Sequence, residues 1–142
     1  MNKMYDVERM ARMINDIERY LRDLKELDIQ SVEDLNDKKN LYAVSMVMFS
    51  ITNRTIDLAD EVVTANSLGL PSTYREIFSL LAKNGYINAA LMDKMSRIVF
   101  YRNLLAHEYY EITAKDLFEL QKNMSVIRQF VDIVKKLLKN ST

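Results

Sequence analysis

Helix-breaking residues are scarce in this chain, and their scarcity limits the possible folds more than any other feature. Only two glycines and one proline occur among 142 residues. Strands joined by tight turns use these residues at many of their turns, so a turn-rich all-β fold is disfavoured and long helices are favoured. Gly69 with Pro71, and then Gly85, mark the ends of two such helices. A chain of this length is expected to form one domain over residues 1–142.

Apolar side chains recur at spacings of three and four along most of the chain, which is the pattern of a buried helix face. The pattern predicts four long helices and one short one, over residues 2–27, 37–67, 73–83, 88–105 and 114–139. Because the links between them are short, these segments predict an all-α antiparallel bundle. The nine methionines are most simply explained as core residues of that bundle.

Polar residues at the starts of these segments support their boundaries. Thr73 followed by Glu76 has the spacing of a capping box, and Asn88 is placed to cap the next helix. Ser31 followed by Asp34 predicts a capped turn inside the polar connection between the first two long helices.

The second long segment is apolar on more than one side. Leu41, Val44 and Met48 begin its main stripe, while Met46 and Phe49 widen the apolar surface. Such a helix packs on more than one side, against other helices of the domain or against a second subunit. The same segment carries a small polar group formed by Asn53, Arg54 and Asp57. This group is either solvent-exposed or the second face of an active site.

Composition excludes several classes of protein. With no cysteine and one histidine, the chain has neither a disulfide framework nor a thiolate or multi-histidine metal site. No apolar run approaches the ~20 residues of a membrane span, and the start lacks the apolar core of a signal peptide. We therefore expect a cytoplasmic protein with no membrane partner. The formal net charge is zero, so composition gives no indication of nucleic-acid binding.

Residues 101–110 stand out because polar, chemically capable side chains interrupt the helical pattern. The only histidine, His107, follows Arg102 and Asn103, and Tyr109 comes two residues later. Arg102 continues the helical spacing of the apolar residues before it, so it needs a polar partner, water or a ligand. From spacing alone, the better explanation of the pair is structural, namely an arginine stacked on a terminal histidine, with both capping the helix end.

The arrangement Arg102-x4-His107 resembles the motif of the HEPN superfamily, and Tyr109 completes the Arg-x4-His-x-Tyr signature of its HepT branch. The segment from Leu70 to Phe78 also resembles the family, as do Tyr86-Ile87 and the run Phe100-Tyr101-Arg102-Asn103. The similarity covers nearly the whole chain. It implies a HEPN-like helical bundle.

The resemblance also implies a function, namely the metal-independent endoribonuclease toxin of a two-gene toxin–antitoxin pair. The partner would be an MntA-like minimal nucleotidyltransferase. By resemblance, Arg102 and His107 are the catalytic pair and Asn103 is the supporting polar residue. Tyr109 matches the tyrosine that the partner silences by adenylylation. No cofactor or metal is implied.

This chemistry is physically reasonable for RNA. A histidine with a pKa near ~6.5 can take the proton of a 2′-hydroxyl that attacks the neighbouring phosphate, and an arginine can stabilise the phosphate oxygens. One chain offers one histidine, whereas the leaving group also needs an acid. A two-fold homodimer with the active site at the interface would supply both roles. The alternative is a non-catalytic HEPN module that binds a nucleotidyltransferase partner or a nucleotide, and a purely structural bundle would leave the motif unexplained.

Overall fold

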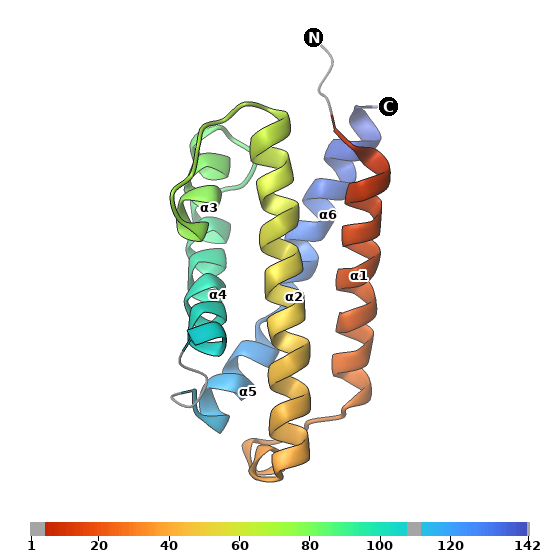
Figure 1. Ribbon diagram of the computed structural model, residues 1–142, viewed down its shortest axis with the longest axis vertical. Coiled ribbons are helices and arrows are strands. Elements are labelled where there is room, and N and C mark those ends of the chain that lie inside the picture. The colour runs from red at the N-terminus through yellow and green to blue at the C-terminus, as the bar shows by residue number, and fades with distance from the viewer. Residues whose placement is uncertain (1–4, 108–111, 142) are drawn as a thin grey trace.

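The computed structural model describes residues 5–107 and 112–141, except for the side chain of His107. Helices account for its regular structure: α1 (Val7–Glu26), the short 3-10 helix η1 (Val32–Asn36), α2 (Lys38–Ala65), α3 (Tyr74–Lys83), α4 (Ala89–His107), α5 (Ala114–Lys122) and α6 (Met124–Asn140). The predicted all-α fold is confirmed. The long helices α1, α2, α4 and α6 run alternately in opposite directions, and both ends of the chain lie at the same end of the bundle (Figure 1).

Helix α2 is the centre of the arrangement. It contacts α1, α3, α4, α5, α6 and η1, so every other helical element of the described chain packs against it. Val44, Met48, Ile51 and Leu58 on this helix are completely buried. The prediction that this helix packs on more than one side is therefore confirmed within a single chain.

Local capping sets most helix boundaries as the sequence predicts. The hydroxyl of Thr73 accepts the N–H of Glu76 at 3.2 Å, and Asn88 accepts the N–H of Leu91 at 2.8 Å. Asp34 accepts the N–H of Ser31, and this contact caps η1. The first helix differs: it begins at Val7 rather than near residue 2, because Asp6 accepts the N–H of Arg9 and caps it.

The helix predicted over residues 114–139 is divided at Asn123, and this is a correction to the predicted boundaries. The N–H of Asn123 bonds to the carbonyl of Leu120, while its own carbonyl accepts the N–H of Val126 and so starts α6. The two pieces have different neighbours, since α5 packs on η1 and α2 whereas α6 packs on α1, α2 and α4. A straight helix over residues 114–139 could not contact both sets of neighbouring elements.

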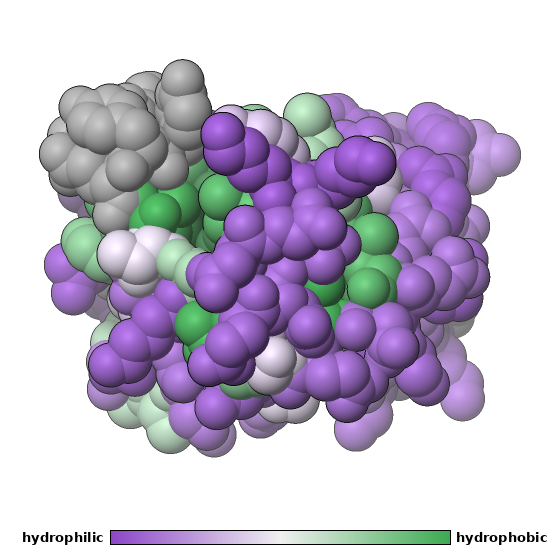
Figure 2. Space-filling model, turned by 90° about the horizontal axis from the view of Figure 1, so that it is seen from below, coloured by the Kyte–Doolittle hydropathy of each residue, from purple (hydrophilic) through white to green (hydrophobic). Residues whose placement is uncertain are grey.

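The end of the bundle that carries η1 and α5 is largely polar (Figure 2). Seen along the bundle axis from the end that carries η1 and α5, hydrophobic residues show only in separate patches between hydrophilic ones (Figure 2). Among the described residues, no helix combines the length and the apolar character that crossing a membrane requires.

Candidate active site

Arg102 is held in place by the way α4 packs. The cap at Asn88 fixes the start of this helix, and Leu91, Met95 and Ile98 bury its inner face. Arg102 follows Ile98 at helical spacing, and Leu105 is buried one turn later. The arginine therefore emerges from a buried seam, half-buried itself, and faces α2 and the start of α3.

Two hydrogen bonds orient the guanidinium group. Nε donates to Oδ1 of Asn53 at 2.7 Å, and Nη1 donates to Oδ1 of Asn103 at 3.1 Å. The first bond joins residues of α2 and α4 that are 49 positions apart in the sequence. Among the described side chains, which do not include that of His107, none accepts a hydrogen bond from Nη2.

Two aromatic rings complete the surroundings of Arg102. Its guanidinium carbon lies 4.7 Å from the ring centroid of Tyr74 and 5.5 Å from that of Phe49. Both distances are within the range of cation–π attraction. Three elements thus position one side chain, because Phe49 belongs to α2 and Tyr74 opens α3.

The polar group predicted on α2 is divided between two faces. Asn53 contacts Arg102, whereas Arg54 turns towards α1 and pairs with Asp16 at 3.0 Å. Asp57 lies 3.6 Å from Arg54 and makes no contact with Arg102. Successive residues of a helix are turned by ~100°, so Asn53 and Arg54 cannot face the same neighbour.

The remaining predicted site residues lie at or beyond the end of α4. His107 is the last residue of this helix, and its side chain lies outside the description, as does Tyr109 altogether. Within the described part of the chain, no group of three or more acidic or histidine side chains could hold a metal ion.

Sequence reasoning missed Phe49 and Tyr74 as partners of Arg102. Phe49 had been noted only for the apolar surface of its helix, and Tyr74 only as part of a resembling segment. Their aromatic character was the one signal that the sequence offered. It could not identify the contact, because the pairing depends on how three helices are rotated against each other.

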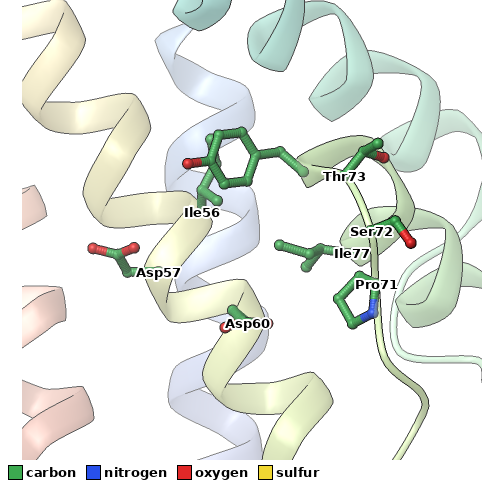
Figure 3. Close-up of a pocket in the computed structure, with 8 residues that line it drawn as sticks. Ile56, Asp57, Asp60, Pro71, Ser72, Thr73 and Ile77 are labelled. Carbon is green, nitrogen blue, oxygen red and sulfur yellow. The ribbon is translucent and has the colours of Figure 1, made fainter.

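A cavity of about 440 Å³ adjoins this site between α2 and the segment that leads into α3. Figure 3 shows α2 contributing Ile56, Asp57 and Asp60 from one side, while Pro71, Ser72, Thr73 and Ile77 come from the other. Tyr74 also lines it. Arg102 does not line the cavity, but Tyr74, whose ring lies against its guanidinium, does.

Comparison with known proteins extends these findings. The family model described as "Ribonuclease HepT-like" matches residues 10–135. The mRNA nuclease HepT of Shewanella oneidensis is 32% identical over 81 residues, which are 56% of this chain and 61% of the relative. The matched part thus spans about three-fifths of the relative's length.

Solved structures share the fold. A tri-AMPylated HEPN toxin of Shewanella oneidensis, in complex with an MNT antitoxin, gives a TM-score of 0.83 at 25% identity, covering 94% of this chain and 99% of that one. The cytosolic protein YutE of Bacillus subtilis, whose function is unknown, gives a TM-score of 0.84 at 16% identity, covering 97% and 94%. The bundle seen here is therefore an arrangement that other proteins adopt.

Proposed function

Because this chain belongs to the HepT-like ribonuclease family, we propose that it is an RNA-cleaving toxin of a toxin–antitoxin pair. The observation that carries the proposal is the oriented guanidinium of Arg102, five residues before the only histidine. The N–H groups at Nη2, which no described side chain engages, suit a phosphate oxygen. The activity named for the Shewanella relative, an mRNA nuclease, supplies the reaction class.

In the proposed reaction, His107 takes the proton of a ribose 2′-hydroxyl, which attacks the adjacent phosphate and expels the 5′-oxygen. Arg102 stabilises the charge that builds on the phosphate oxygens, while Asn103 and Asn53 hold the guanidinium in position. Cleavage without a metal or cofactor is part of this proposal, because His107 and Arg102 could themselves supply the proton transfer and the charge stabilisation.

The departing oxygen needs an acid, and a second copy of the chain provides it in this proposal. Tyr42 and Met46 are 63% and 67% exposed, and they continue along α2 the row that leads through Phe49 to Asn53. An exposed apolar row that ends at Arg102 supports a two-fold interface there, with two Arg102–His107 pairs in one cleft.

We propose that a partner protein silences the toxin by modifying Tyr109, two residues after His107. The partner we propose is an MntA-like minimal nucleotidyltransferase, since the Shewanella HEPN toxin occurs with an MNT antitoxin and carries AMP groups. Tyr109 is the proposed acceptor of adenylate. Bulky anionic groups there would repel RNA from the cleft. In this proposal the protein acts in the cytoplasm, where the proposed RNA substrate and partner are found.

Expression in cells of the wild-type chain and of variants that lack the motif residues tests the proposal. We expect the wild-type chain to arrest growth and degrade RNA, and the variants Arg102→Ala and His107→Ala to do neither. Purified protein should cleave RNA in the presence of a metal chelator. A matched control is Arg97→Ala, which removes an arginine from the same helix but outside the Arg102 contacts.

The competing function is a non-catalytic module that binds a nucleotidyltransferase partner or a nucleotide. The zero net charge favours it, because a chain without excess positive charge attracts RNA weakly. Wild type and His107→Ala would then be equally harmless, and RNA would stay intact in both. That outcome would replace the ribonuclease proposal with the binding module.

A further inference from the structure

The cavity beside Tyr74 has features that the proposed cleavage chemistry does not use. Its floor is apolar, since Ile56 and Ile77 are each only 4% exposed. One wall is the side chain of Tyr74, whose ring also meets Arg102. A flat aromatic ligand is the kind of molecule that such a floor and wall accommodate, because it can stack on the tyrosine.

The rim of the cavity is acidic, and its two carboxylates differ. Asp57 points away from α3 in Figure 3, on the side where Arg54 approaches it at 3.6 Å. Asp60 lies across from Pro71, and its carboxylate has no hydrogen bond or ion pair within residues 5–107 and 112–141. Asp60 therefore offers two unused acceptor atoms to whatever occupies the cavity.

Among the RNA bases, guanine matches this combination. Its Watson–Crick edge presents two adjacent donors, N1–H and the N2 amino group, which a single carboxylate can accept together. Adenine and cytosine place an acceptor nitrogen beside their one amino group. The lone pair of that nitrogen would be repelled by a carboxylate oxygen. Uracil has a single N–H between two carbonyl oxygens.

We propose that this cavity is a base-binding subsite that holds a guanine next to the scissile phosphate, with Asp60 as the residue that selects it. The inference rests on the proposed ribonuclease function. The position of Tyr74 supports it, because one face of the site holds the phosphate at Arg102 and the adjoining hollow receives the neighbouring base. In this arrangement the negative rim attracts the N–H donors of the base, while Arg102 binds the phosphate backbone of the RNA.

Cleavage of matched oligonucleotides tests the subsite. The RNAs differ in one base beside a single scissile bond, and kcat/KM is measured for wild type, Asp60→Asn and Asp23→Asn. Asp23→Asn is the control, since it makes the same charge change at an exposed position on α1. We expect wild type and control to favour guanine, and Asp60→Asn to lose about tenfold or more of its guanine-over-adenine preference. Unchanged preference in Asp60→Asn, or none in wild type, would overturn the proposal.

Binding by a cleavage-deficient chain keeps the two proposals separate. In the His107→Ala background, fluorescence anisotropy with the same oligonucleotides should show a guanine preference that Asp60→Asn removes. If wild type cleaves no RNA, the ribonuclease proposal fails, yet this preference still supports the subsite and its absence rejects it. Binding of GMP as tight as that of the guanine oligonucleotide would assign the cavity to a free nucleotide instead. Equal melting temperatures would show that each variant is folded.

Discussion

At the scale of single residues, Arg102 is restrained before any ligand arrives. An arginine side chain has about 2 kcal/mol of rotamer entropy to lose when it is fixed. The bond to Asn53 at 2.7 Å and the rings of Tyr74 and Phe49 already limit its motion in the folded chain. A phosphate that binds to a pre-oriented guanidinium meets a smaller ordering cost, so we expect Asn53 and Phe49 to contribute to the proposed function by positioning Arg102.

Asn53 is the most direct test of this positioning. Asn53→Ala removes the acceptor for Nε of Arg102, and hydrogen bonds to charged groups contribute about 1.5–3 kcal/mol. We expect RNA cleavage to slow by about tenfold or more, with kcat affected more than KM. Asn36→Ala, at an exposed asparagine of η1, is the matched control and should cleave normally. A folded Asn53→Ala protein with wild-type kcat would show that the contact has no functional role.

Tyr109 is the residue whose modification we expect to silence the protein. After co-expression with an MntA-like nucleotidyltransferase, mass spectrometry of the peptide should show added adenylate on Tyr109, and the modified protein should no longer cleave RNA. The neighbouring Tyr110 provides the control, so Tyr110→Phe should be modified normally and Tyr109→Phe should not. Adenylate found on Tyr110 alone would show that the wrong tyrosine was chosen.

At the scale of elements, α4 determines where the arginine is placed. Its start is fixed by one side-chain cap, because Oδ1 of Asn88 accepts the N–H of Leu91 at 2.8 Å. Its inner face is fixed by buried residues at helical spacing, among them Leu91 and Met95. A helix whose start and buried face are both fixed has little freedom to rotate, so Arg102 must point at α2 and α3.

Removal of this cap should cost measurable stability. Asn88→Ala leaves the first N–H groups of α4 without the side-chain acceptor, and we expect the free energy of unfolding to fall by about 1 kcal/mol. Urea unfolding followed by circular dichroism measures the change. Asn36→Ala is the comparison, since the exposed side chain of Asn36 makes no hydrogen bond within the described part of the chain, and it should cost less. Equal losses at the two positions would contradict the assigned role of Asn88.

At the scale of the whole molecule, the main feature that the single chain leaves exposed is the start of the apolar row on α2, which runs from Tyr42 through Met46 to Phe49. Tyr42 and Met46 remain exposed although α2 contacts every other described helical element. Their row continues to Phe49 and Asn53, which contact Arg102. An interface on this row would bring two copies of the site together, and this is the geometry that the proposed acid–base exchange requires.

A charge placed on this row should separate the copies. Met46→Glu is expected to convert a dimer into a monomer, as measured by light scattering, and to abolish RNA cleavage, because a buried unpaired carboxylate strongly opposes association. Leu70→Glu is the control, since Leu70 is 97% exposed and outside the row, and it should leave the dimer intact. A wild-type monomer that cleaves RNA at the same concentration would disprove the dimer.

The helices and most of their ends could be predicted from local sequence patterns. Capping joins residues about three positions apart, as in Thr73 with Glu76 and Asn88 with Leu91, so it can be read from spacing. The apolar period likewise identified the buried faces, whereas Arg102 and His107 were predicted as the catalytic pair only through the resemblance to the HEPN motif.

The side chains that surround the arginine could not be predicted, because they depend on how the helices pack. Asn53 and Tyr74 meet Arg102 because three helices pack with particular rotations and heights, and neither quantity is encoded in the spacing along any one helix. The same holds for the division at Asn123, where one apolar period continues through two helices that meet different neighbours. Local rules specify the elements, whereas the contacts between elements depend on the packing of the whole core.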